Sequence, residues 1–161
     1  MGNSSIPKQQ IVEHVDLYAY QGTWYEIARK PNFFEEEKAF NITAQYELLE
    51  NGTMSVLNSE EFFSHGVLIK KTKRGIARVT NTETNSQLSV KFSGVPFEGE
   101  YWIVRLVGES PNYTDVVVSH RGGRYLWILS RNKTSNNVEM LVNSLLKEGY
   151  DLSTLIFTEQ K

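Results

Sequence analysis

The chain has 161 residues, a length that fits one domain with a sizeable hydrophobic core. Its formal net charge of −2 gives no electrostatic reason to expect a nucleic-acid partner, because binding phosphates needs a basic surface stripe. The absence of cysteine excludes disulfides, thiolate metal sites, thiol catalysis and a cysteine-based lipid anchor.

The middle of the chain consists of short segments in which apolar and polar residues alternate, separated by polar or glycine-containing breaks. This pattern is typical of an antiparallel barrel or sandwich. Asn51-Gly52 favours a tight hairpin turn between the second and third strands. The segment 67–72 is either a strand of its own or a frayed continuation. The predicted strands span residues 22–30, 40–50, 53–59, 67–72, 75–80, 87–93, 101–107, 113–119 and 124–131.

One amphipathic helix is predicted near the end of the chain. Ser135 is the expected N-cap, and Gly149 is placed to end the helix in a left-handed conformation. A short strand, 155–158, should follow. We assign residues 1–11 to a flexible N-terminal segment and 12–161 to a single domain. The apolar face of the helix is formed at the expected spacing by Val138, Leu141, Val142, Leu145 and Leu146.

Two segments about a hundred residues apart carry a family resemblance. The first is Gly22-Thr23-Trp24, followed in the sequence by Tyr25-Glu26-Ile27. The second is Arg124-Tyr125-Leu126-Trp127-Ile128-Leu129-Ser130-Arg131. Together they resemble the first and third signature motifs of the lipocalins. The similarity covers roughly residues 12–158. Within the family, the chain is similar to the subgroup that contains bacterial outer-membrane lipocalins, apolipoprotein D and plant temperature-induced lipocalins.

The resemblance implies an all-β fold: an eight-stranded antiparallel up-and-down β-barrel with one C-terminal α-helix packed on the outside. In the family, the signature Trp plugs the closed end of the barrel and the Arg lies across it. Gly22, Trp24 and Arg131 are therefore expected to stabilise the fold rather than contact a ligand. A guanidinium stacked on an indole is a favourable arrangement for such a pair.

Alternation along the strands and the motif alignment predict which side chains point into the barrel. Most of them are apolar or aromatic, which suits an elongated or planar apolar ligand with one polar end. These side chains could instead fill the barrel themselves. The predicted ligand-binding residues are Tyr46, Val56, Asn58, Ala77, Val90, Phe92, Tyr101, Ile103, Val116, Val118 and Trp127.

The first strand and the loop after it raise two further expectations. If Trp24 points inward, Glu26 and Ala28 should also point inward, and Glu26 then needs a polar partner such as Arg105 or a tyrosine, or serves as an anchor for a ligand headgroup. In the loop 31–37, Phe33 and Phe34 either close over the mouth of the barrel or belong to an ordinary solvated loop. The three glutamates of this loop would disfavour anionic molecules at the entrance.

The expected function is non-catalytic: binding, transport or scavenging of a small hydrophobic ligand such as a fatty acid or lysophospholipid. None of the three histidines lies in a metal or catalytic spacing, so we expect no enzyme activity, no metal site and no cofactor. Two alternatives remain at this point. One is a tetrapyrrole or haem binder that uses His120, and the other is a protein-interaction module with a filled barrel.

The N-terminus and a loop at the rim of the predicted barrel give expectations for location and partners. The N-terminus has no apolar signal-peptide region and no lipobox, which as written favours the cytoplasm; a secreted or periplasmic protein would look the same if a leader had been removed. Pro96-Phe97 at the barrel rim allows peripheral membrane contact, although Glu98 beside it weakens such an anchor. We expect a monomer or weak dimer.

Overall fold

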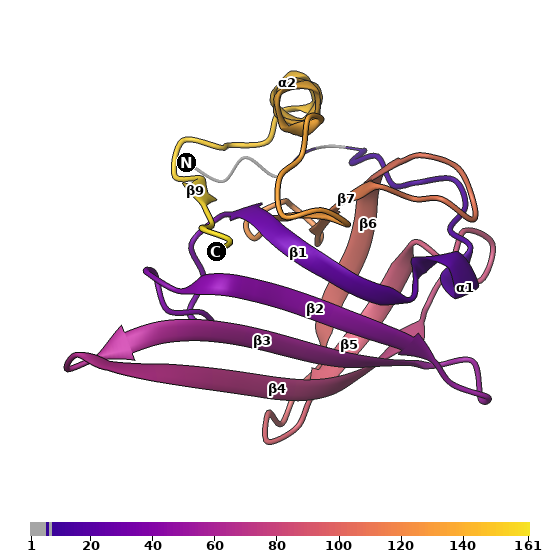
Figure 1. Cartoon of the computed structure of the whole chain (residues 1–161). Helices are drawn as coiled ribbons and strands as arrows, with labels where there is room; N and C mark the ends of the chain where they lie inside the picture. Colours follow the sequence, from indigo (N-terminus) through magenta and orange to yellow (C-terminus); the bar gives the residue numbers. More distant parts are fainter. Residues whose placement is uncertain (1–5, 7) are drawn as a thin grey trace.

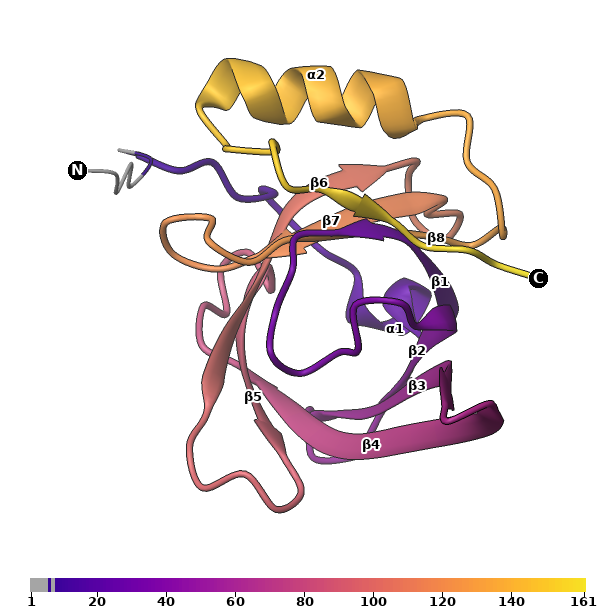
Figure 2. The same cartoon turned by 90° about the vertical axis from the view of Figure 1, so that its left-hand side faces the viewer.

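Eight antiparallel strands curve into a closed barrel in the computed structural model, which describes residue 6 and residues 8–161 (Figures 1 and 2). Strand β1 closes the barrel because it pairs with β2 through Trp24 and Ala44 and with β8 through Tyr25 and Ser130. The predicted fold class is confirmed. The barrel strands are β1 (Gly22–Arg29), β2 (Phe40–Leu48), β3 (Met54–Ser64), β4 (Val67–Val79), β5 (Gln87–Phe92), β6 (Gly99–Val107), β7 (Asp115–Ser119) and β8 (Trp127–Ser130).

The β3–β4 hairpin is longer than the sequence pattern predicted. Strands 67–72 and 75–80 were expected separately, but β4 is one continuous strand that pairs with β3 from Met54 to Ser64. The charged segment Lys70-Lys71-Thr72-Lys73-Arg74, at the expected boundary of the two strands, is instead a paired and mostly exposed part of this arm. The turn is His65-Gly66, and both residues have positive φ (50° and 78°), as a two-residue hairpin turn requires.

A short helix that the sequence analysis missed, α1 (Leu17–Tyr20), lies at one end of the barrel (Figure 1). Asp16 caps it by accepting hydrogen bonds from the backbone N–H groups of Tyr18 and Ala19. The helix has only four residues, so it shows no apolar periodicity. Its effect is to bring Tyr20, which is 1% exposed, into the interior of the barrel.

Helix α2 (Val138–Glu148) packs on the outside of the barrel, as expected (Figure 2). Gly149 ends it with φ 110° and donates to the carbonyls of Leu145 and Leu146. Two details of the prediction are wrong. The N-cap is Asn137 rather than Ser135, because the Ser135 hydroxyl donates to Asp115, and Leu146 is 51% exposed rather than buried.

A β-bulge in β1 changes which side chains face the interior. The register with β8 pairs Glu26 with Leu129 but Ala28 with Ile128, so Ile27 is the extra residue. Glu26, which precedes the bulge, lines the cavity as alternation predicts, whereas Ala28 after the bulge packs in the outer apolar cluster beneath α2. The expectation that Ala28 points inward was therefore wrong. Sequence alternation cannot anticipate a one-residue shift of this kind.

Both ends of the described chain contact the barrel. Strand β9 (Ile156–Phe157) pairs with β1, a shorter strand than the predicted 155–158. Within the segment expected to be flexible, Ile6 is buried and the Gln9 side chain donates to the His120 carbonyl and the Tyr150 hydroxyl. The remainder of that expectation, residues 1–5 and 7, lies outside the described residues. Over the part of the chain that is described, no helix is long and apolar enough to cross a bilayer.

Candidate functional site

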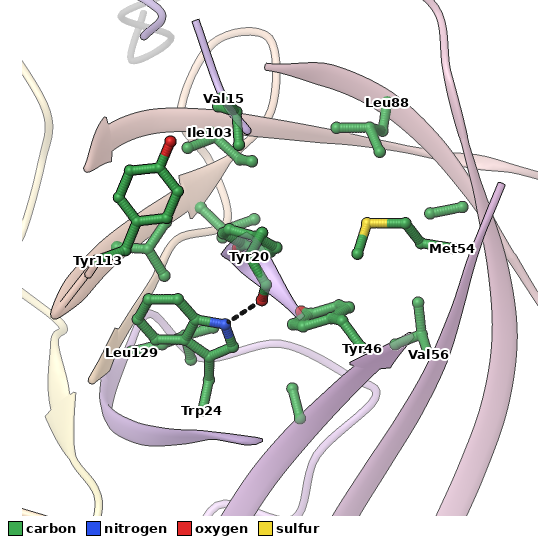
Figure 3. Close-up of a cluster of buried hydrophobic side chains, with 14 residues drawn as sticks. Val15, Tyr20, Trp24, Tyr46, Met54, Val56, Leu88, Ile103, Tyr113 and Leu129 are labelled. Carbon is green, nitrogen blue, oxygen red and sulfur yellow. Dashed lines mark hydrogen bonds between the residues drawn. The ribbon is translucent and has the colours of Figure 1, made fainter. Parts of the chain in front are cut away.

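The closed end of the barrel is sealed by Trp24 and Arg131. The Arg131 guanidinium lies 3.8 Å from the centre of the indole ring, and the indole N–H donates to the Tyr20 carbonyl (Figure 3). Arg131 also donates to the carbonyls of Thr23, Ala19 and Gln21. Gly22 has φ 103°, and a Cβ there would lie 3.3 Å from the guanidinium. These residues therefore hold strand β1 and helix α1 together, which is a structural role.

Above this plug the barrel encloses a cavity of about 350 Å³, which is within the range of small-molecule sites. Its walls are mainly apolar. Three of the predicted ligand-binding residues, Ala77, Ile103 and Val116, do not line it; they are almost fully buried in the core below. The predicted residues that do line the cavity are Tyr46, Val56, Asn58, Val90, Phe92, Tyr101, Val118, Trp127, Phe33 and Phe34.

Three tyrosine hydroxyls form a chain at the inner end of the cavity. The Tyr101 hydroxyl donates to Tyr46 at 2.8 Å and lies 2.7 Å from the Tyr20 hydroxyl. Burial raises the pKa of Tyr46 to about 12, and it raises the pKa values of Tyr20 and Tyr101 well above their usual value. All three hydroxyls are therefore protonated at neutral pH. Tyr46 and Tyr101 line the cavity, whereas Tyr20 lies behind them.

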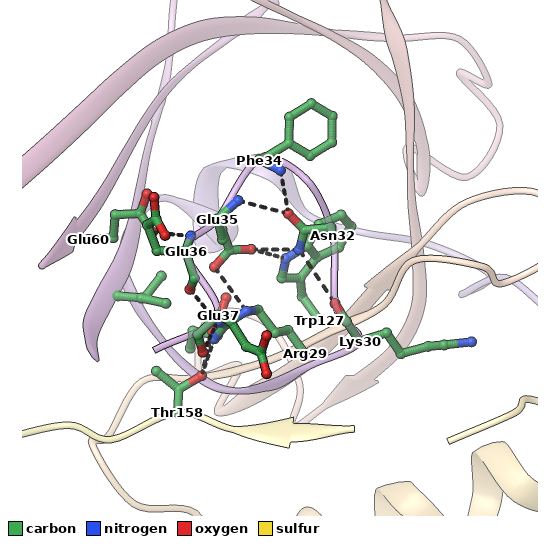
Figure 4. Close-up of polar contacts among 12 residues, drawn as sticks. Arg29, Lys30, Asn32, Phe34, Glu35, Glu36, Glu37, Glu60, Trp127 and Thr158 are labelled. Atoms are coloured by element: carbon green, nitrogen blue, oxygen red, sulfur yellow. Dashed lines mark hydrogen bonds and ion pairs between the residues drawn. The ribbon is translucent and has the colours of Figure 1, made fainter. Parts of the chain in front are cut away.

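The loop between β1 and β2 crosses the mouth of the barrel (Figure 2). The Glu35 carboxylate turns inward and accepts from the Trp127 indole N–H at 2.7 Å and from the Asn32 side chain at 3.0 Å (Figure 4). Phe33 and Phe34 contact each other with ring centres 4.1 Å apart, and Phe33 is 73% exposed. This loop is thus a lid fastened to the barrel wall, with one phenylalanine left open to solvent.

Arg29 fastens the same loop from below. Its guanidinium donates to the carbonyls of Glu36 and Glu37 at 2.8 and 2.9 Å (Figure 4), and it also forms an ion pair with Glu26 at 3.0 Å. The Thr158 hydroxyl donates to the same Glu26 oxygen. Glu26 is therefore partnered near the mouth by Arg29 and Thr158. The expected partner Arg105 instead pairs with Glu148 outside the barrel.

The carboxylates of the mouth are crowded. Burial raises the pKa of Glu26 well above its usual range, and the negative charge of Glu35 raises it further, while Arg29 and Thr158 oppose the rise. Burial and Glu35 also raise the pKa of Glu60. Lys71 lies 3.9 Å from Glu60 and lines the same cavity. The mouth therefore presents charges of both signs around an apolar interior.

His120 lies on the cavity wall, but its ring is engaged. Its Nε2 accepts a hydrogen bond from the Tyr125 backbone N–H at 2.9 Å, and the ring stacks on the Tyr125 ring. Nothing in this geometry favours His120 as an axial haem ligand. No group of three or more His, Asp or Glu side chains that could hold a metal ion occurs among the residues described.

Several residues of the site were not identified from the sequence. Tyr20 lies on the missed helix, Arg29 follows the bulge, and Glu60 lies just beyond the predicted strand 53–59; Glu35 was expected only as one of three glutamates at the entrance. A weak signal was available for Glu35, because it follows two phenylalanines in a loop expected to cover the mouth. No local pattern marks the other three, since each acquires its role from residues distant in sequence.

Comparisons with known proteins agree with this geometry. Residues 15–160 match the family model described as a lipocalin-like domain. The chain is 37% identical to the outer membrane lipoprotein Blc of Escherichia coli (93% of this chain, 82% of that protein) and 31% identical to temperature-induced lipocalin-1 of Arabidopsis thaliana (95% and 83%). Insecticyanin from the tobacco hornworm Manduca sexta has a similar fold, with a TM-score of 0.69 at 22% identity, over 95% of this chain and 85% of that one.

Proposed function

Because this chain belongs to the lipocalin family, whose members bind small hydrophobic ligands, we propose that it is a non-catalytic carrier or scavenger of a lipid-like amphiphile. The observation that carries the proposal is the apolar cavity of about 350 Å³, which ends in polar groups at the mouth. Such a site buries a hydrocarbon chain and leaves a headgroup near water.

The charges at the mouth favour particular headgroups. Glu35 and Glu60 face the cavity together with Lys71 and Lys73, so a zwitterionic headgroup finds partners of both signs. A free carboxylate would also meet Lys71 and Lys73, but without a positive group of its own it would be repelled by Glu35 and Glu60. We therefore propose a lysophospholipid or a similar neutral or zwitterionic lipid in preference to an ionised fatty acid.

Trp127 supplies the test, because it is the tryptophan that lines the cavity, whereas Trp24 lies in the plug and Trp102 faces outward against Arg121. Titration with dodecanoyl lysophosphatidylcholine should change the intrinsic fluorescence in a saturable way. The change should be lost in Trp127→Phe and kept in the control Trp102→Phe. If neither this lipid nor dodecanoic acid gives a saturable response or displaces a bound apolar dye, the proposal is wrong.

We also propose that the mouth end rests on a lipid bilayer when the ligand is exchanged. The tip of the β3–β4 hairpin projects beyond the barrel (Figure 1) and exposes apolar side chains on both faces. Phe33 and Phe97 are exposed beside the cavity entrance. A projecting tip that is apolar on both faces suits insertion among lipids better than a flat protein contact. The exposed residues of the tip are Phe63, Val67, Leu68 and Ile69.

A further inference from the structure

We infer that the inner end of the cavity recognises a neutral oxygen acceptor, such as a hydroxyl or carbonyl, on the end of the ligand that enters first. This inference rests on the proposed function, because it concerns the same cavity. It depends on the tyrosine chain, in which Tyr101 lies between Tyr20 and Tyr46.

The tyrosine chain has one more proton than it has hydrogen bonds. Three protonated hydroxyls carry three O–H donors, but the chain contains only two O–H···O contacts, so one donor has no acceptor among the described residues. Tyr101 donates to Tyr46, so Tyr20 must donate to Tyr101. The remaining proton is then on Tyr46. A buried donor without an acceptor is costly, which favours an acceptor that enters from the cavity.

The surroundings of Tyr46 identify the kind of acceptor. Apolar side chains, including Ala44, Val56 and Leu129, line the same cavity. The guanidinium of Arg131 is engaged by the indole of Trp24 and by three backbone carbonyls. An ionised carboxylate placed beside Tyr46 would lose its hydration without gaining a counter-charge. A hydroxyl, ketone or ester oxygen accepts the same hydrogen bond at a much smaller desolvation cost.

The position of Tyr46 makes it a specificity-determining residue rather than a general binding residue. An unsubstituted alkyl chain can still fill the cavity, but it leaves the Tyr46 proton without an acceptor or traps a water molecule beside it. A chain with a terminal oxygen satisfies the donor. The protein should therefore prefer ω-hydroxylated chains over their unsubstituted parents, against the general tendency of apolar cavities.

The test compares matched probes in the full-length protein. Dodecanoyl and hexadecanoyl lysophosphatidylcholine are each paired with the derivative that carries an ω-hydroxyl on the acyl chain, and Kd is measured by displacement of a bound apolar dye. We expect at least one ω-hydroxyacyl lipid to bind about fivefold to tenfold more tightly than its parent, as one neutral hydrogen bond allows. Two chain lengths are used because the ω-hydroxyl must reach Tyr46 at the inner end, and the depth of the cavity decides which chain is long enough.

Three variants locate the donor. Tyr46→Phe frees the Tyr101 proton, which also faces the cavity, so the preference should fall only partly. Combining Tyr46→Phe with Tyr101→Phe should abolish it. Tyr20→Phe is the matched control: it removes a buried hydroxyl of the same chain but leaves the Tyr46 proton in place, so the preference should remain. Far-ultraviolet circular dichroism and dye affinity report whether each variant is folded.

The outcomes separate this inference from the proposed function. If the parent lysophosphatidylcholines bind but the wild-type protein shows no preference for ω-hydroxy chains, the inference about Tyr46 is overturned and the carrier function stands. The same conclusion follows if the double variant keeps the wild-type preference. If no amphiphile displaces the dye, the carrier function itself fails.

Discussion

The guanidinium of Arg131 lies 3.8 Å from the centre of the Trp24 indole and donates to three backbone carbonyls, so one side chain joins the last barrel strand to the first and to helix α1. This relationship explains why the barrel has one closed end. It also separates the roles of the two ends: the signature residues stabilise the plug, whereas the opposite end is left to the ligand.

We expect Arg131→Met to lower the free energy of unfolding by about 2–4 kcal/mol, because it removes a partly desolvated cation–π contact and charged hydrogen bonds. Arg121→Met is the matched control. Arg121 lies 5.5 Å from the Trp102 ring, but its side chain is 78% exposed. Arg121→Met should therefore lower the free energy of unfolding by no more than about 0.5 kcal/mol. Urea denaturation measures both; similar losses for the two variants would contradict the structural role of Arg131.

Glu26 should make stability depend on pH. Its pKa is raised in the folded protein, mainly by burial and then by Glu35, so the folded state keeps this proton at pH values where the unfolded chain releases it. The contribution of Glu26 to stability is therefore greatest below about pH 4.5 and falls as the pH rises toward the folded pKa.

Glu26→Gln keeps a neutral side chain that can donate to Glu35, and it removes this titration. The variant should have a stability close to that of the wild type at about pH 4 and should become increasingly more stable than the wild type as the pH rises toward about 8. Denaturant unfolding at several pH values measures the difference. A difference that is constant over this range would show that Glu26 has an unshifted pKa.

If the hairpin tip inserts into a bilayer, the contribution of an exposed leucine to vesicle binding should depend on where it lies on the molecule. Leu68 on the hairpin tip and Leu146 on helix α2 are both 51% exposed. Leu68→Ser should weaken sedimentation with phosphatidylcholine–phosphatidylserine vesicles by about tenfold, while Leu146→Ser should leave it unchanged. Equal binding by the two variants would argue against insertion of the tip. Wild-type protein that does not sediment with vesicles would refute the membrane contact altogether.

Gly75 is predicted to be intolerant of a side chain. A Cβ at this position of β4 would lie 2.8 Å from the Phe92 ring and 3.0 Å from the Lys91 carbonyl. Gly75→Ala should therefore destabilise the protein by about 1–3 kcal/mol and press Phe92 toward the cavity. Gly99→Ala in β6, where no heavy atom lies within 4 Å, should be neutral or slightly stabilising. Thermal unfolding of the two variants provides the comparison.

The sequence by itself determined the barrel, the outer helix and the closed end. Alternation marks each strand wherever one face is buried, and the stripe from Val138 to Leu145 marks the helix, because both signals are local. Gly22, Trp24 and Arg131 form a recognisable motif whose partners lie at fixed places in the family fold.

Only the tertiary structure decided the chemistry of the cavity. The one-residue bulge at Ile27 turns Ala28 outward although Glu26 before it points inward as alternation predicts, and no local pattern encodes such a shift. The mouth depends on Glu35 reaching Trp127, and the inner end depends on hydroxyls from α1, β2 and β6 meeting at Tyr101. These contacts join residues that are far apart in the sequence. They form only when the barrel closes, because closure fixes the register that brings them within hydrogen-bonding distance.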